Sequence, residues 1–164
     1  MSNDGLGGCD EETVVNMITI TDALVAEHRQ LRDLFDQIET LLPNLATLAE
    51  VRLLATLVGG LLRGHDAAEQ NLAYAALDHV LQDRDRIDRL HQDHEEIDAS
   101  LERAQTARGI EEARRLLKAS IVASREHFRR EERSVFPLVE RELQHETLTA
   151  LGTARLAPPG DSVV

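Results

Sequence analysis

The sequence predicts an all-α fold, an antiparallel up-down four-helix bundle, from two properties of the chain. Aromatic residues make up only 2% of the 164 residues and tryptophan is absent, so the core must be aliphatic. Leucine and alanine favour helices, and β-branched residues do not dominate. Apolar residues also recur at helical spacing in four long stretches separated by short connections. Amphipathic helices joined in this way pack as an antiparallel bundle.

The first two helices are predicted over residues 21–42 and over 47–76. Pro43 ends the first, because the residue before a proline disfavours helical conformation. Thr47-Leu-Ala-Glu50 is a capping box, whose side chains satisfy backbone N–H groups at a helix start. The interior stripe of the first helix is Leu24, His28, Leu31, Phe35, Ile38 and Leu42. The stripe of the second helix is Leu54, Val58, Leu61, His65, Glu69, Leu72 and Ala76.

The third and fourth helices are predicted over residues 85–107 and 111–144. Arg108-Gly109 between them is typical of a helix end. Pro137 should kink the fourth helix, because it removes a backbone hydrogen bond and clashes with the preceding turn. The third stripe includes Leu90, His94, Ile97, Leu101 and Ala104. The fourth includes Leu117, Ile121, Ser124, His127, Glu131, Val135 and Leu138.

One domain over residues 17–146 contains these helices, and both ends of the chain are expected to be flexible tails. Residues 1–16 are rich in glycine and acidic residues and show no clear period. Residues 147–164 include Ala157-Pro-Pro-Gly-Asp, a composition typical of disorder.

The charge balance and the cysteine count narrow the classes of function. A net charge of −12 argues against nucleic acid and against an anionic membrane surface as partners, because both need a basic face. Cys9 is the only cysteine, so no internal disulfide can form and a reducing compartment is expected. With no signal-peptide pattern and no apolar run of transmembrane length, we expect a cytoplasmic protein. The oligomeric state stays open, a monomer included.

Two stretches of the chain repeat one pattern of histidine and glutamate. In each stretch a Glu follows a His by four residues: Glu69 follows His65, and Glu131 follows His127. Each is preceded by a further His on an apolar stripe, at positions 28 and 94. Residues four apart lie about 40° apart around a helix, so both side chains can reach one centre. The spacing alone is weak evidence, because His91 and Glu95 share it, but all six residues also lie on interior stripes.

Six such residues in one core predict a site for two metal ions. Burying a carboxylate without a partner costs several kcal/mol, and cations would compensate that cost. The alternative is a polar network of paired His and Glu without metal. Mixed imidazole and carboxylate ligands suit iron, manganese or zinc, whereas calcium and magnesium prefer oxygen ligands. Two ions held by six protein ligands leave room for an oxo or hydroxo bridge and a small exogenous molecule.

The motifs of the chain resemble those of the hemerythrin family, in its HHE cation-binding branch, over residues 20–143. The resemblance implies a four-helix bundle around a non-haem di-iron centre. It also implies that His28 and His65 serve one iron and that His94 and His127 serve the other, with Glu69 and Glu131 bridging. The motifs that carry it are Glu27-His28-Arg-Gln-Leu31, His65-Asp-Ala-Ala-Glu69, Asp93-His94-Glu-Glu-Ile97, His127-Phe-Arg-Arg-Glu131-Glu132 and Val135-Phe-Pro137.

The chain departs from the oxygen-carrying members of that family at two positions. Those carriers have a fifth His four residues before the position of His94, whereas His91 stands three before. They also have an Asp five residues after the last His, whereas Glu131 stands four after. His91 is included among the expected metal ligands, although it could instead donate a hydrogen bond to a ligand or flank the site.

The expected function is binding of O2 or a related small molecule such as nitric oxide or peroxide at the iron pair. Without His91 as a ligand the centre would be more open, which favours sensing, iron handling, or chemistry on peroxide or nitric oxide. The sequence does not decide whether the protein is an enzyme. A metal-free helical interaction module is the remaining alternative.

Overall fold

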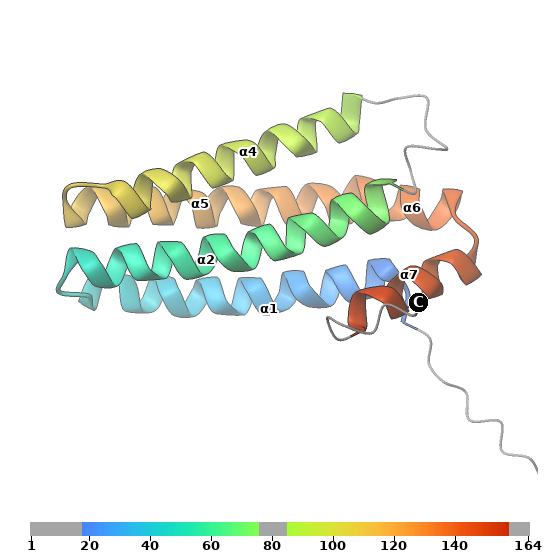
Figure 1. Cartoon of the computed structure of the whole chain (residues 1–164), viewed down its shortest axis with the longest axis horizontal. Helices are drawn as coiled ribbons and strands as arrows, with labels where there is room; N and C mark the ends of the chain where they lie inside the picture. Colours follow the sequence, from blue (N-terminus) through green and yellow to red (C-terminus); the bar gives the residue numbers. More distant parts are fainter. Residues whose placement is uncertain (1–17, 76–84, 158–164) are drawn as a thin grey trace, which may run out of the picture.

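The computed structural model describes residues 18–75 and 85–157, which contain helices and no β-strand. Figure 1 shows the four long helices lying side by side, with the shorter helices α6 and α7 at one end of the bundle. The predicted all-α bundle is confirmed. The tail predicted over residues 1–16, Cys9 and the predicted end of the second helix at Ala76 lie outside the described residues. The long helices are α1 (Ile20–Leu41), α2 (Leu48–Ala68), α4 (Asp85–Thr106) and α5 (Ile110–Arg130).

Side-chain caps define where α1 and α2 begin. At the start of α2, the Thr47 backbone N–H donates to Glu50 Oε2 at 2.8 Å, and the Glu50 N–H donates to Thr47 Oγ1 at 3.3 Å. This is the predicted capping box. Thr19 and Asp22 form a second one at the start of α1. Pro43 lies in a short 3-10 helix, η1 (Leu42–Asn44), which ends α1 as expected.

Two π-helical segments interrupt the bundle, and each begins at a glutamate of the repeated motif. Segment η2 (Glu69–Tyr74) continues α2, and segment η3 (Glu131–Val135) joins α5 to α6 (Phe136–Glu142). The single helix predicted over residues 111–144 is therefore divided into three parts, and Pro137 lies in the first turn of α6. A π turn accommodates an extra residue, so it changes which face of the helix points inward after the glutamate.

The apolar core has two parts, with a polar layer of histidine and glutamate between them. Along α1, Leu24 belongs to one part and Leu31 to the other, and His28 lies between them. The buried face of α2 differs from the predicted stripe, because Leu62 is buried and Leu61 is 51% exposed. Leucines occupy several faces of α2, so hydrophobic spacing alone does not identify the buried one.

Helix α7 (His145–Leu156) follows α6. The sequence had predicted a flexible tail from residue 147 onward. Gly152 packs against the start of α1, and a Cβ atom there would lie 2.1 Å from the Ile18 carbonyl oxygen. Arg155 donates to both carboxylate oxygens of Glu27 on α1, at 2.8 and 3.0 Å. The helix has no clear apolar stripe, which is why periodicity did not indicate it.

None of the helices within residues 18–75 and 85–157 combines the length and the apolar composition needed to cross a membrane.

Candidate metal centre

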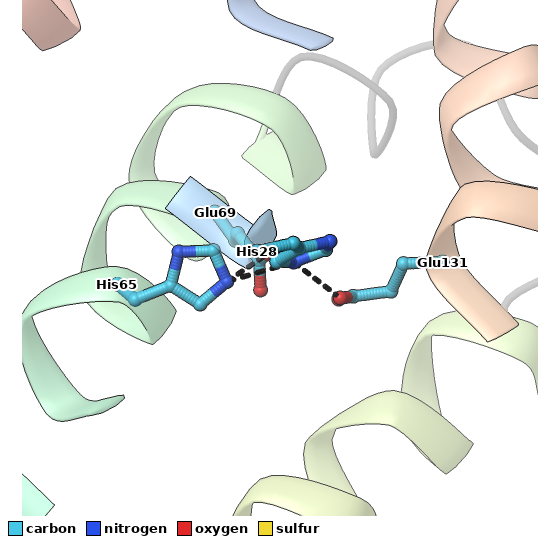
Figure 2. A group of neighbouring side chains, drawn as sticks. All are labelled: His28, His65, Glu69 and Glu131. Carbon is cyan, nitrogen blue, oxygen red and sulfur yellow. Dashed lines mark hydrogen bonds and ion pairs between the residues drawn. The ribbon is translucent and has the colours of Figure 1, made fainter. Parts of the chain in front are cut away.

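Six of the seven expected ligands meet in the polar layer between the two parts of the core. They form two groups of four buried side chains, and in each group the potential ligand atoms lie within 4.8 Å of one another. Both groups contain Glu69 and Glu131, and each adds one pair of histidines. Figure 2 shows the side chains of the first group pointing toward one another, from α1, α2 and the π-helical segments η2 and η3. The groups are His28, His65, Glu69 and Glu131, and Glu69, His94, His127 and Glu131.

The Nε2 atoms of each histidine pair face each other across a short distance. The two atoms are 2.9 Å apart for His28 and His65, and 2.7 Å apart for His94 and His127. One cation between each pair could accept both nitrogen lone pairs, which is how imidazole binds metals. The arrangement therefore has two positions, which we call the first position (His28 and His65) and the second position (His94 and His127).

Each of the two glutamates places its oxygens toward both positions. Oε1 of Glu69 lies 3.1 Å from His65 Nε2, and Oε2 lies 3.6 Å from His94 Nε2. Oε1 of Glu131 lies 3.1 Å from His127 Nε2, and Oε2 lies 3.4 Å from His28 Nε2. A carboxylate in this orientation can share its charge between two ions.

The opposite ring nitrogen of each histidine contacts a further polar side chain. Such a contact fixes the orientation of the ring, and a carboxylate at Nδ1 makes Nε2 a stronger ligand. Three of the four partners are carboxylates, and the fourth, an amide, has the longest contact. The Nδ1 contacts are His28 with Glu132 at 2.9 Å, His65 with Glu27 at 2.9 Å, His127 with Asp93 at 3.3 Å and His94 with Gln70 at 3.5 Å.

Two of these supporting carboxylates, Glu27 and Asp93, were not assigned a role from the sequence, although each directly precedes a motif histidine. The signal was present as the dipeptides Glu27-His28 and Asp93-His94. Each carboxylate, however, contacts the histidine of another helix, so the sequence alone does not show which ring it orients. Glu132 and Gln70, which follow the shared glutamates, were not among the expected ligands.

The shared carboxylates have buried oxygens without hydrogen-bond partners. Both oxygens of Glu69 and Oε2 of Glu131 are of this kind, and both side chains are 0% exposed. Leaving buried charged groups unpaired costs several kcal/mol, so these oxygens need positive charge nearby, either from protonated histidines or from bound cations. Cations bound by the carboxylate oxygens and the histidine nitrogens would meet that need, and the residues present therefore fit a pair of metal ions.

The same carboxylates control the proton affinity of the histidines. Burial lowers the pKa of His65, but the charges and hydrogen bonds of Glu69, Glu27 and Glu131 together outweigh burial and raise that pKa to about 10. Burial also lowers the pKa of His127, but the hydrogen bond and charge of Glu131, together with Glu69 and Asp93, outweigh burial and raise that pKa to about 9. In contrast, burial and the neighbouring His127 lower the pKa of His94 to about 3. Protons and metal cations therefore compete for the same nitrogens.

The two halves of the chain differ in how they support the shared glutamates. The Tyr74 hydroxyl donates a hydrogen bond to Oε1 of Glu131. Burial raises the pKa of Tyr74 well above its usual value, so the phenol stays protonated and remains a donor. The corresponding residue 62 positions later is Phe136, which has no hydroxyl and leaves Glu69 without an equivalent donor.

His91, the seventh expected ligand, lies outside both groups. It is half-buried, and its ring packs edge-on against Tyr74 with ring centroids 5.9 Å apart. It lines a surface groove of about 580 Å³ between α2 and α4, together with Asp66, Gln70 and His94. The groove brings solvent to the edge of the second position.

The chain was compared with protein families, curated proteins and solved structures. The family model of the hemerythrin HHE cation-binding domain matches residues 19–149 of the sequence. No curated protein and no solved structure matches. The family match covers most of the chain, including every residue of the two groups, and agrees with the expected resemblance. The chain therefore belongs to the hemerythrin HHE cation-binding domain family.

Proposed function

We propose that the protein is a non-haem di-iron protein that binds O2 or a related small molecule. The observation that carries this proposal is the pairing of four buried imidazoles around two shared carboxylates, three of whose four oxygens have no hydrogen-bond partner. Iron is chosen over manganese and zinc because of the family, since the nitrogen and oxygen ligands suit all three metals.

In this proposal the residues have separate roles. His28 and His65 hold the iron of the first position, and His94 and His127 hold that of the second. Glu69 and Glu131 bind both ions. Iron, when bound, supplies one-electron redox chemistry and a place for a small molecule to bind. The protein orients the ligands, and Tyr74 holds Glu131 in place through its hydrogen bond.

A surface groove adjoins each position, but the aromatic surroundings of the two positions differ. The His28 ring lies between two aromatic rings, stacked on Phe128 at 4.1 Å and near Phe136 at 5.5 Å between centroids. His94 lines the groove between α2 and α4, and His65 lines a second groove of about 490 Å³ beside Glu27 and Arg155. We expect O2, nitric oxide or peroxide to reach the centre through the groove between α2 and α4, on the side of the second position.

Metal analysis combined with optical spectroscopy tests the proposal. The protein would be reconstituted with ferrous iron under anaerobic conditions, and then exposed to air, reduced, and treated with azide. We expect about two irons per chain and a visible absorption band that forms in air, changes with azide and disappears on reduction. The matched control is Glu95→Gln, which changes an exposed Glu that follows His91 at the same spacing as the motif.

The proposal fails if reconstituted protein retains much less than one iron per chain, or if Glu131→Gln retains iron as well as the control does. Tight binding of zinc or manganese with no retention of iron would keep a metal function but exclude di-iron chemistry.

A second candidate function is enzymatic turnover of peroxide or nitric oxide. The position of His91 outside both groups favours it, because the second position then has only two imidazole ligands and is open to the groove. Steady consumption of peroxide by the iron-loaded protein, lost in Glu131→Gln, would support this candidate. A loaded protein that binds peroxide without consuming it would exclude it.

A further inference from the structure

The residue that follows the second histidine differs in chemistry between the two halves of the chain. In the first half it is Asp66, after His65, and in the second half it is Phe128, after His127. Both side chains point toward a histidine of a different helix. Phe128 stacks on His28 of the first position, whereas Asp66 contacts His94 of the second position. Among the described residues, a third carboxylate therefore contacts a histidine Nε2 atom, the nitrogen that faces the metal, at the second position only.

Asp66, like His91, lies outside both groups of potential ligands, but unlike His91 it lies close to the histidine nitrogen that faces the metal position. Its Oδ1 is 3.5 Å from Nε2 of His94, about as far as Oε2 of Glu69 at 3.6 Å. The helix explains this geometry, because residues three apart, such as Asp66 and Glu69, share one face. Within the described residues, the contact with His94 is the one ion-pair contact of the Asp66 carboxylate.

Asp66 lines the groove between α2 and α4, together with Arg63, Gln70 and His94. Its side chain is only 13% exposed. A carboxylate that is this deeply buried is costly to keep charged unless a cation lies close to it. His94 is also the one histidine of the four whose Nδ1 contacts an amide, Gln70, instead of a carboxylate. A carboxylate ligand at the second position would offset that missing negative charge.

We propose that Asp66 is a seventh ligand, which binds the metal ion of the second position through its carboxylate, in the role that the sequence suggested for His91. This inference depends on the proposed metal function. Asp66 would complete a ligand set of two imidazoles and three carboxylates at the second position. The first position would have two imidazoles and two carboxylates, with Phe128 where the extra ligand would lie.

The test compares Asp66→Asn with two controls, His91→Ala and Glu95→Gln. Asparagine keeps the shape and can still accept a hydrogen bond, but it has no charge and is a weaker ligand. Iron content would be measured during competition with a chelator, and Mössbauer spectra would be recorded on protein reconstituted with ⁵⁷Fe. Circular dichroism of the metal-free variants would verify that each one folds.

We expect the wild type to show two inequivalent iron sites. In Asp66→Asn one iron should bind at least about 10-fold more weakly, since even residues behind the ligands contribute about that much. One of the two Mössbauer signals should change, and both controls should match the wild type. Unchanged iron affinity and spectra in Asp66→Asn would overturn the inference, as would weaker binding in His91→Ala alone.

Failure of the proposed function would look different, because the wild type itself would then retain no iron. In that case the same variants are loaded with zinc or cobalt. Loss of one ion per chain in Asp66→Asn would still support the ligand role, and two ions per chain in that variant would exclude it.

Discussion

Replacing Glu69 by glutamine should affect the metal-loaded protein far more than the metal-free one. The amide keeps the shape of the side chain and removes a buried negative charge whose oxygens have no hydrogen-bond partner. His65, 3.1 Å away, can release its proton when that charge is removed, so no unpaired charge remains. For the metal-free protein we therefore expect a change in the free energy of unfolding of only about 1 kcal/mol.

In the metal-loaded protein, the expected loss of metal affinity and of stability follows from the position of Glu69 between the two histidine pairs. A weakening of about 10–100-fold at one ion corresponds to about 1.4–2.7 kcal/mol. Because the side chain faces both positions, the total reaches about 3–5 kcal/mol for two ions. At this chain length 1 kcal/mol shifts Tm by about 2–4 °C, so the metal-dependent part of Tm should fall by about 6–20 °C.

Thermal unfolding followed by circular dichroism, with excess ferrous iron and separately with a chelator, measures this difference. The quantity of interest is the iron-dependent rise in Tm of each variant, with Glu95→Gln as the exposed control. The reasoning would be refuted if Glu69→Gln kept the full iron-dependent rise, or if Glu95→Gln lost as much of it.

Three further predictions concern the metal-free protein. Tyr74→Phe leaves Oε1 of Glu131 without its donor and should lower the free energy of unfolding by about 1–3 kcal/mol in urea titrations; no change would exclude that hydrogen bond. The pKa values of His65 and His127 are raised to about 10 and about 9, above the unfolded value of about 6.5. Their stabilisation is complete below pH 6.5 and is lost as pH rises through 9–10, so urea midpoints should fall over that range, and a flat profile would contradict the assignment. Gly152→Ala would bring a methyl group against the backbone that precedes α1, and it should destabilise the protein by about 1–3 kcal/mol; a neutral result would show that α7 can shift freely.

Helical periodicity and residue chemistry were sufficient to predict the bundle and the six residues that meet in its core. A residue on an interior stripe must face other helices, so a buried His or Glu there must meet the polar residues of the other stripes. Which face of α2 is buried was predicted less well, because leucines surround that helix. The π segments were not predicted, since a change from i→i+4 to i→i+5 hydrogen bonding has no clear pattern in one sequence.

The sequence by itself determined the helical fold, the family and the repeated His and Glu motif, because these depend on local spacing along single helices. Only the tertiary structure decided which side chains from different helices meet. It brings Asp66 to 3.5 Å from Nε2 of His94, whereas the ring of His91 packs against Tyr74. The physical reason is that contacts between helices depend on their packing and on the π turns, which shift side chains around the axis without any change in the apolar pattern.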